Sequence, residues 1–347
     1  MSPYALSMLL SSLSTGTIIT FTSNHWFLAW VGLELNTLAM IPLMSKTHHP
    51  RATEAATKYF LTQAAASALL LFATTLNAWH TGEWTIFCMQ NTAPTLMLTI
   101  ALMIKLAVAP FHLWLPDVIQ GLDLMTCLIL LTWQKLAPMT LMIQVSPELN
   151  PMLLITFGIL SIILGGWGGL NQPQVRKIMA YSSIAHLGWM TTILIYFPQL
   201  AILNLLIYLI MTSAMFFMLL NLMSTNINKM AISWTKFSSL TPTMMIILMS
   251  LGGLPPTSGF MPKWLILEEL IKQDMTPIAT IMSLSTLLSL FFYLRLSYAT
   301  SLTTPPTLQN LKLLWQLNGS NYQMMPTMII ISIMLLPILP TILNYFK

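Results

Sequence analysis

Charged side chains are nearly absent from this sequence. Asp, Glu, Lys and Arg together make up 7% of the 347 residues, whereas 56% are hydrophobic. A separate soluble domain needs a long polar stretch, and the longest polar candidate runs only from Ser301 to Met324. The composition therefore excludes a separate soluble domain and predicts an integral membrane protein.

Cysteine is also scarce. With only Cys88 and Cys127, the sequence excludes a cysteine-ligated iron–sulfur cluster and a disulfide framework within this chain. It contains no metal-ligand cluster, catalytic triad or dinucleotide-binding fingerprint. The run from Gly165 to Gly169 lacks the preceding strand and the Lys-Ser pair of a phosphate loop, so close helix packing explains it better. A basic n-region and an A-x-A cleavage site are missing too, so we expect the first apolar run to remain in the mature protein.

Apolar runs follow one another almost from end to end. A helix needs about 20 mostly apolar residues to cross roughly 30 Å of hydrocarbon. The sequence offers eleven such runs, and we predict an all-α polytopic membrane protein with a single transmembrane domain over residues 1–347. The predicted spans are 3–22, 25–44, 56–79, 93–119, 124–145, 149–171, 175–195, 198–223, 239–272, 275–299 and 325–344.

Basic side chains are distributed unevenly between the predicted loops. Lysine and arginine in short loops accumulate on the cytoplasmic or equivalent side of a membrane. With eleven alternating spans, the side of the N-terminus receives nine of them and the other side only Lys272 and Lys347. We therefore expect the N-terminus inside and the C-terminus outside. The nine are Lys46, Arg51, Lys58, Arg176, Lys177, Lys229, Lys236, Arg295 and Lys312.

Four charged residues lie far inside apolar runs: Glu34, Lys105, Lys135 and Lys263. A charged side chain at a bilayer centre costs roughly 2.5–3.5 kcal/mol on insertion scales and about 10 kcal/mol or more in simulations of isolated helices. Residues kept at that cost usually serve ion or proton paths. We therefore take these four as the candidate functional residues.

The run around Lys105 contains a predicted helix break. Pro110 follows Lys105 by five residues, removes one backbone donor and clashes with the carbonyl of Leu106. Freed carbonyls at membrane depth are tolerated only inside protein or beside a watery cavity. We therefore expect Lys105 beside a hydrated break, with His112 as a candidate proton relay. A kink near Pro110 that serves only packing is the alternative.

A second predicted break covers Gly252 to Pro262. Three glycines and three prolines in this segment are incompatible with regular helix. Apolar stretches flank the segment, so we predict a second discontinuous helix, near Gly253 to Pro262, with Lys263 at its edge. The alternative is a plain loop between two shorter helices, with Lys263 reaching the membrane surface.

Glu34, Lys135 and His186 fall inside the second, fifth and seventh predicted spans. An unpaired carboxylate at mid-span is costly, so Glu34 should be protonated or meet a cation, and three lysines are candidates. The imidazole of His186 passes protons near neutral pH, which suits a relay between lysines. A histidine that only hydrogen-bonds a neighbouring helix is the alternative for His186 and for His112.

Several segments together carry a family signature: His25 through Glu34, Pro50 to Ala55 with Lys58 to Gln63, Leu131 to Pro138, Gly165 to Trp189, and Gly252 to Trp264. In this order they resemble the family of NADH:ubiquinone oxidoreductase chain 2, the mitochondrially encoded antiporter-like membrane subunits of respiratory complex I. The likeness covers nearly the whole chain. The segment around Pro110 and His112 is shared with sister antiporter-like chains and with multisubunit sodium/proton antiporters. Those relatives are longer, so 347 residues favour the shortened animal form.

The resemblance implies an antiporter-like fold that carries a proton path. Two positions depart from the family pattern: Ala107 stands where glycine is common, and Asp117 replaces a glutamate but keeps the charge. The implied path pairs Glu34 with Lys105 and continues through Lys135 toward Lys263, with His112 and His186 as relays.

The resemblance also implies partners and a location. NADH, FMN, iron–sulfur clusters and ubiquinone are expected in other subunits, so this chain would hold no cofactor and no redox centre. The expected partners are antiporter-like chain 4, small membrane subunits and the lipid bilayer, with no nucleic acid. The expected location is the mitochondrial inner membrane, with the N-terminus in the matrix and the C-terminus in the intermembrane space.

Simple electrostatics permits a relay driven by redox chemistry elsewhere in such a complex. At an effective dielectric constant near 20, opposite charges about 4 Å apart attract by roughly 4 kcal/mol. Moving a charge against about 100 mV costs roughly 2.3 kcal/mol, so pulling Glu34 away from Lys105 would help to eject a proton. Two other classes stay open: a stand-alone cation/proton antiporter, and a structural membrane subunit whose charges only pair across helices.

Overall fold

The computed structural model describes residues 2–89, 91–232, 240–255, 257–302, 324–338 and 340–341. Within these ranges the chain is mostly helical and forms no strand, apart from isolated bridges at His25–Thr85 and Gln174–Asn226. The predicted all-α class is therefore confirmed. Predictions that concern Lys236, Lys312, Lys347 and Pro256 lie outside the described residues.

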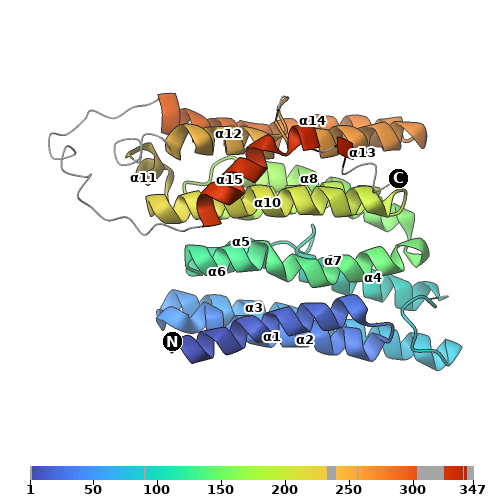
Figure 1. Cartoon of the computed structure of the whole chain (residues 1–347). Helices are drawn as coiled ribbons and strands as arrows, with labels where there is room; N and C mark the ends of the chain where they lie inside the picture. The colour runs from blue at the N-terminus through green and yellow to red at the C-terminus, as the bar shows by residue number, and fades with distance from the viewer. Residues whose placement is uncertain are drawn as a thin grey trace. The chain divides into compact units, whose positions relative to one another are not determined.

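The chain divides into two compact units, Met1–Ser161 and Ile162–Lys347, and each is described by itself. In the first unit α1 packs on α2, α2 and α4 pack on α3, and α7 contacts α1, α2, α4 and α6 (Figure 1). A single domain over 1–347 stays a prediction. The elements of this unit are α1 (Pro3–Thr22), α2 (Trp26–Met44), η1 (Ser45–Thr47), α3 (Pro50–Thr81), α4 (Thr92–Leu106), α5 (Trp114–Gly121), α6 (Leu124–Leu131), α7 (Trp133–Val145) and η2 (Ser146–Glu148).

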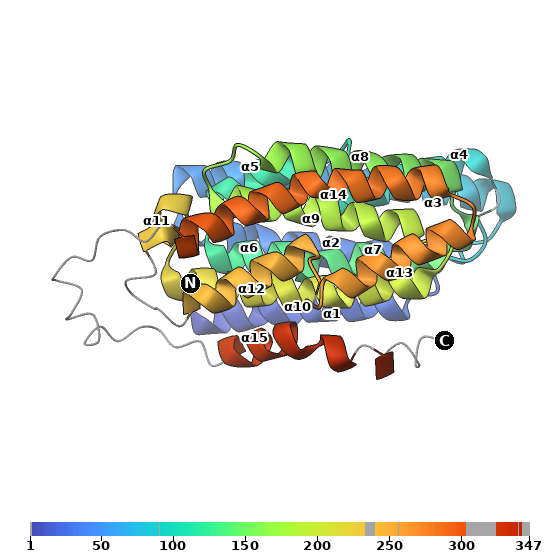
Figure 2. The same cartoon turned by 90° about the horizontal axis from the view of Figure 1, so that it is seen from above.

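The second unit is built around α10, which contacts α9, α12, α13 and α15. Figure 2 shows α13 continuing beyond the end of α12, with a non-helical segment between them. The elements are α9 (Val175–Ile193), α10 (Pro198–Leu222), α11 (Ile227–Ile232), α12 (Leu240–Gly252), α13 (Phe260–Lys272), α14 (Thr276–Ser297), the π-helical turn η4 (Tyr298–Leu302), α15 (Met324–Met334) and η6 (Leu336–Ile338); α8 (Pro151–Gly169) begins in the first unit and ends in the second.

The glycine-rich end of α8 packs closely on α9. A Cβ on Gly165 would lie 2.8 Å from the backbone nitrogen of Ala185, and a side chain on Gly168 would collide with the ring of Tyr181. The two helices approach this closely because the glycines lack side chains. The prediction that the Gly165–Gly169 run serves helix packing is confirmed.

Seven helical segments of the described chain are long and apolar enough to cross a membrane: Pro3–Thr22, Trp26–Met44, Pro50–Thr81, Leu124–Glu148, Pro151–Gly169, Pro198–Leu222 and Thr276–Thr300. The other four predicted spans fall on α4 with α5, on α9, on α12 with α13, and on α15. Two of these four are divided by non-helical residues, and α4, α12 and the apolar part of α15 are shorter than a full span. The structure therefore describes a multi-pass membrane protein, while the count of eleven stays a prediction.

α4 ends at Leu106 with a left-handed residue rather than at a proline. Ala107 has φ 61° and ψ 42°, and its N–H donates to the carbonyl of Ile104 at 3.1 Å. The N–H of Val108 donates to the carbonyl of Met103 at 3.0 Å. This double hydrogen bond around a left-handed residue is the Schellman motif, in which glycine is the usual residue at the position of Ala107.

The left-handed conformation of Ala107 explains in physical terms why glycine is common at this position in the family pattern. A left-handed conformation costs a residue with a Cβ about 1–2 kcal/mol relative to the right-handed one, whereas glycine pays almost nothing. Ala107 is fully buried, so its neighbours fix this conformation. The backbone turn that glycine usually makes is therefore kept here with alanine.

We expect Ala107→Gly to raise the stability of the chain. Relief of the left-handed strain gains about 1–2 kcal/mol, and the greater freedom of glycine in the unfolded chain removes about half of that. The measurement is thermal unfolding of the purified chain in detergent. Ala101→Gly is the matched control, because Ala101 is buried in the middle of α4 and the same change there should destabilise by about 1 kcal/mol. Equal destabilisation by both substitutions would contradict strain at Ala107.

Candidate functional site

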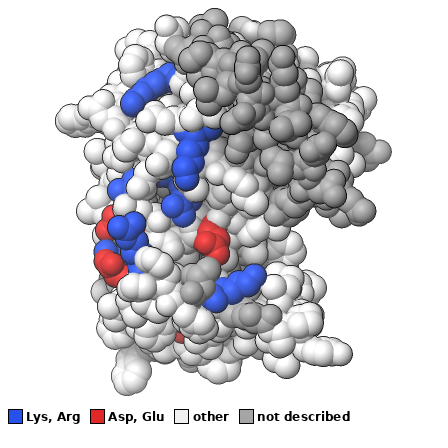
Figure 3. Space-filling model, turned by 90° about the vertical axis from the view of Figure 1, so that its left-hand side faces the viewer, with Lys and Arg blue, Asp and Glu red and all other residues white. Residues whose placement is uncertain are grey.

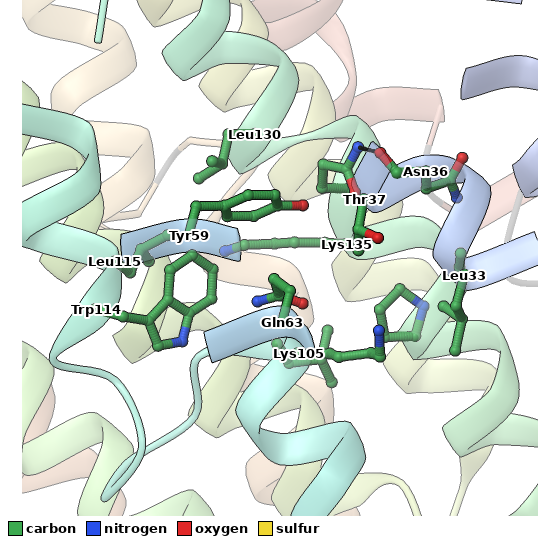
Figure 4. Close-up of a pocket in the computed structure, with 14 residues that line it drawn as sticks. Leu33, Asn36, Thr37, Tyr59, Gln63, Lys105, Trp114, Leu115, Leu130 and Lys135 are labelled. Carbon is green, nitrogen blue, oxygen red and sulfur yellow. Dashed lines mark hydrogen bonds between the residues drawn. The ribbon is translucent and has the colours of Figure 1, made fainter. Parts of the chain in front are cut away.

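The first unit contains a small buried cavity of about 20 Å³. Side chains from α2, α3, α4, α5, α6 and α7 converge on it (Figure 4). A cavity needs roughly 10–15 Å³ to hold one water molecule, so this one accommodates a single water. The residues that line it are Leu33, Asn36, Thr37, Tyr59, Gln63, Lys105, Leu106, Trp114, Leu115, Leu130, Gln134, Lys135, Ala137 and Pro138.

Two of the four predicted site residues, Lys105 and Lys135, line this cavity. Their exposed fractions are 7% and 4%, so both side chains are buried among the helices. Lys105 lies in the last turn of α4, where a cation interacts favourably with the negative end of the helix dipole. Two positive charges around one cavity repel each other, so their separation and their counter-charges decide which protonation state is favoured.

Buried polar atoms without a protein partner surround the same cavity. Within the described chain, Lys105 Nζ, both side-chain amide atoms of Asn36, and Gln63 Nε2 have no hydrogen-bond partner. Leaving such a group unsatisfied costs about 1–3 kcal/mol, and more for a charged one. A water molecule with two to four polar partners removes that cost, and the cavity has both the room and the partners. The arrangement therefore favours a hydrated connection between α2, α3 and α4.

Glu34 does not form the direct ion pair with Lys105 that we expected. No ion pair within 4.0 Å joins the two residues; the Thr37 hydroxyl instead shares its proton between the backbone carbonyl of Glu34, at 2.9 Å, and Glu34 Oε2, at 3.2 Å. The carboxylate still acts on Lys105 electrostatically, and it acts on Tyr59 as well. Glu34 lies on α2 beside Asn36 and Thr37, which line the cavity, so the interaction runs over a longer distance than a contact.

Lys135 follows a helix interruption that the sequence analysis did not predict. α6 ends at Leu131 and α7 begins at Trp133, with Thr132 between them at φ −110° and ψ −70°. Pro138 lies inside α7 and leaves the carbonyl of Gln134 without its usual helical donor. The Gln134 side chain donates to the backbone carbonyl of Asn36 at 3.3 Å, which fixes α7 against α2 beside the cavity.

The two candidate relay histidines are both buried but lie in different units. His112 belongs to the segment between α4 and α5, is 8% exposed, and its Nδ1 has no hydrogen-bond partner in the described chain. His186 lies on α9 in the second unit and packs its ring against Tyr208, with centroids 5.4 Å apart. Neither histidine lines the Lys105 cavity.

Lys263, in the second unit, caps the end of α12. Its Nζ donates to the carbonyl of Gly252 at 2.8 Å and to that of Leu251 at 3.4 Å. Gly253 has φ 79°, and a Cβ there would lie 2.8 Å from Lys263 Nζ. The last carbonyls of a helix have no helical donor, so an ammonium at this position gives them a hydrogen-bond donor. Its charge also interacts favourably with the negative end of the helix dipole. Glycine at 253 allows both the turn and the approach of the lysine.

Three polar residues of the cavity, Asn36, Tyr59 and Gln63, were not among the predicted site residues. Asn36 is 2% exposed, Gln63 4% and Tyr59 2%, and each lines the cavity. The available signal was helical spacing: Tyr59 and Gln63 are four residues apart, and so share one face of α3. An amide inside an apolar run carries no formal charge, so it attracts less notice than a lysine at the same depth.

Two family models together cover nearly the whole chain. The one described as NADH:quinone oxidoreductase/Mrp antiporter, TM matches residues 23–289, and the one described as NADH dehydrogenase subunit 2 C-terminus matches residues 290–343. NADH-ubiquinone oxidoreductase chain 2 of Polypterus ornatipinnis is 57% identical over 346 residues, which covers 100% of both chains.

A shark relative and one solved structure agree with these matches. NADH-ubiquinone oxidoreductase chain 2 of Squalus acanthias is 57% identical over 345 residues, which covers 99% of each chain. A chain of respiratory complex I from Thermus thermophilus with bound Aureothin superimposes with a TM-score of 0.85 at 25% identity. The superposition covers 98% of this chain and 78% of that one.

We expect Lys263→Met to loosen the end of α12. The substitution removes charge-assisted hydrogen bonds worth about 1.5–3 kcal/mol, so amide exchange of Gly253 and Leu254 should rise by roughly 10- to 100-fold. The measurement is hydrogen–deuterium exchange by mass spectrometry on the chain in solubilised native membranes. Lys272→Met is the control on the same helix, because Lys272 is exposed and pairs with Glu268 and Glu269 at the end of α13, away from α12. Unchanged exchange in the Lys263 variant would show that the cap contributes nothing.

Proposed function

Because the chain belongs to the family of NADH-ubiquinone oxidoreductase chain 2, we propose that it carries a proton path of buried Glu and Lys residues. It is an antiporter-like membrane subunit of respiratory complex I and takes part in that oxidoreductase as one subunit. The family resemblance indicated by the sequence motifs is confirmed. The proton path itself is our inference from the site.

The Lys105–Lys135 cavity is the observation that supports the path most directly. A proton moves through protein along groups that both accept and release it, joined by hydrogen bonds. Lysines from two helices, a buried phenol and buried amides meet at a cavity with room for water. A purely structural role needs polar groups that are already paired, whereas Lys105 Nζ, the Asn36 amide and Gln63 Nε2 have no protein partner within the described chain.

We assign the residues as follows. Glu34 modulates Lys105 through space, and a shift of the carboxylate relative to the lysine changes the hold of Lys105 on its proton. Lys105 and Lys135 exchange protons through water in the cavity, and His112 relays between this cavity and the neighbouring break. Lys263 and His186 continue the path in the second unit. Redox chemistry in other subunits drives the movement of Glu34.

We also propose the number of spans, their orientation and the neighbouring subunits. α4 with α5 and α12 with α13 form two discontinuous spans, which together with α9, α15 and the seven long segments make eleven spans in one domain. The N-terminus faces the matrix of the mitochondrion and the C-terminus faces the intermembrane space. Antiporter-like chain 4 and small membrane subunits are neighbours, and the cofactors and redox centres lie in other subunits.

We expect Lys105→Met to lower the number of protons pumped per electron while the complex still assembles. Methionine fills similar space and removes the buried charge, so packing is largely kept while the proton carrier is lost. The measurement is proton uptake during NADH oxidation in sealed vesicles, with assembly checked by native electrophoresis. Lys229→Met is the control, because Lys229 is exposed on α11.

Two outcomes would redirect the assignment. An unchanged proton-to-electron ratio in the assembled Lys105 variant would remove Lys105 from the path and favour a structural role for the charges. Sodium-driven pH changes in liposomes that hold this chain alone, without an electron donor, would favour a stand-alone cation/proton antiporter.

A further inference from the structure

A pocket with side chains of both charges opens at the beginning of α3. Its volume is about 210 Å³, and it is lined by Arg51, Glu54, Ala55, Lys58, Asp117, Gln120 and Gly121. Lys58 Nζ lies 2.8 Å from Glu54 Oε1 and 3.7 Å from Asp117 Oδ2. We call Glu54, Lys58 and Asp117 the mouth cluster. On the face drawn in Figure 3, acidic side chains lie directly beside lysine and arginine side chains.

The mouth cluster is not needed to hold α3 and α5 together. Its three side chains are 62%, 45% and 57% exposed, and ion pairs so exposed contribute little to stability. The helices are held by close backbone packing instead, since a Cβ on Gly121 would come within 2.5 Å of the Arg51 carbonyl oxygen. The position of these charges therefore calls for a role other than packing.

The mouth cluster lies one helical turn from the buried cavity. Tyr59 follows Lys58 on α3, and Trp114 precedes Asp117 by three residues on α5. Residues three or four apart are neighbours on a helix, and one turn rises about 5.4 Å. Tyr59 and Trp114 both line the Lys105 cavity, and their rings pack with centroids 5.9 Å apart. The aromatic pair thus lines the cavity, within about one helical turn of the mouth cluster along α3 and α5.

The wall of the cavity behind this pair is polar. Gln63 is 4% exposed and lies four residues beyond Tyr59, with its Nε2 unpartnered in the described chain. Trp114 is fixed in place by its indole N–H, which donates to the carbonyl of Ile104 at 3.1 Å. That carbonyl belongs to the residue before Lys105. Gln63 and Lys105 therefore line the same cavity as the two rings.

We propose that the mouth cluster is the site where protons from the aqueous phase are loaded into the buried cavity, with Tyr59 and Trp114 as the gate between them. This inference rests on the proposed proton path and names its uptake site. The sequence places this end of α3 on the side that we assign to the matrix. The mixed charge favours water and protons over an anionic ligand, because Glu54 and Asp117 offset Arg51 and Lys58.

The loading step conserves protons. A carboxylate of the cluster accepts a proton from hydronium in the pocket, becomes a neutral acid and loses its attraction to Lys58. It then gives that proton to a water molecule on the cavity side and returns to a carboxylate that pairs with Lys58 again. The proton finally binds the neutral amine of a cavity lysine, which becomes an ammonium.

The test uses the double variant Glu54→Gln and Asp117→Asn in the assembled complex in sealed membranes. The titratable or charged groups around the cluster are Arg51, Glu54 and Lys58 on α3, Asp117 on α5, and His49, whose Nδ1 accepts from the Arg51 N–H. Removing both carboxylates limits loading when hydronium is scarce. We expect coupled NADH oxidation to match the unmodified complex near about pH 6.5 and to fall by about threefold or more near about pH 8.5.

Two reference variants separate this inference from the proposed function. Glu148→Gln removes an exposed carboxylate of the short helix η2 that lines neither pocket, and should leave the pH profile unchanged. Lys105→Met reports on the path itself. A normal pH profile in the double variant, together with impaired pumping in Lys105→Met, would overturn the loading role of the mouth cluster but not the proposed proton path. Normal pumping in the double variant and in Lys105→Met would overturn both proposals.

Tyr59→Phe and Trp114→Phe test the gate separately. Each keeps a ring between the pocket and the cavity, so assembly should survive. Trp114→Phe removes the hydrogen bond to Ile104, and we expect the ring to move and the vesicles to leak protons at rest. Tyr59→Phe keeps the ring but loses the hydroxyl, and should slow loading at high pH. Resting proton leak and pH profile identical to those of the unmodified complex in both variants would overturn the gate.

Discussion

The need to satisfy polar groups away from water governs this structure. In hydrocarbon a backbone carbonyl or an ammonium without a partner costs several kcal/mol, so regular helices dominate the described chain. The three membrane lysines occur where that regularity fails. Lys105 lies two residues before the left-handed Ala107, Lys135 three residues after the interruption at Thr132, and Lys263 binds the last carbonyls of α12. The C-terminal end of a helix offers the negative dipole that favours a cation, and Lys105 and Lys263 lie at such ends, whereas Lys135 lies in the first turn of α7.

The lysines use helix ends in different ways, and the difference bears on function. Lys263 donates to two carbonyls, so its ammonium is held and satisfied. Lys105 belongs to the helix that ends, and its Nζ faces the cavity without a protein hydrogen bond in the described chain. An ammonium that donates hydrogen bonds to the protein is stabilised in its charged form. The protonation of an ammonium that depends on water and a distant carboxylate changes with its surroundings. In the proposed path, Lys105 is therefore the position that a movement of Glu34 would affect most.

Much of this arrangement was predictable from the residues alone. Charges inside apolar runs marked Lys105, Lys135 and Lys263, and the glycine and proline cluster marked the end of α12. The predicted position of the first helix break was less accurate. Pro110 predicted it, but the helix ends earlier because Ala107 turns left-handed, and an alanine gives no sign of that conformation.

The contacts between helices were not predictable. The cavity depends on which faces of α2, α3 and α7 meet, and no local pattern encodes this. Helical spacing put Tyr59 and Gln63 on one face of α3, but only the structure shows that this face meets Asn36 and the two lysines at the cavity. Glu34 and Lys105 likewise interact without a direct contact: no ion pair within 4.0 Å joins them, and the Thr37 hydroxyl, one turn further along α2, lies 3.2 Å from the carboxylate.

The most direct test is a map of the assembled complex at a resolution that shows ordered water, with attention to the cavity around Lys105. We predict one water molecule within hydrogen-bond distance of Lys105 Nζ and of Gln63 or Asn36, with Glu34 apart from the lysine. A dry cavity, with the Glu34 carboxylate in direct contact with Lys105, would contradict it and make the pair a structural one.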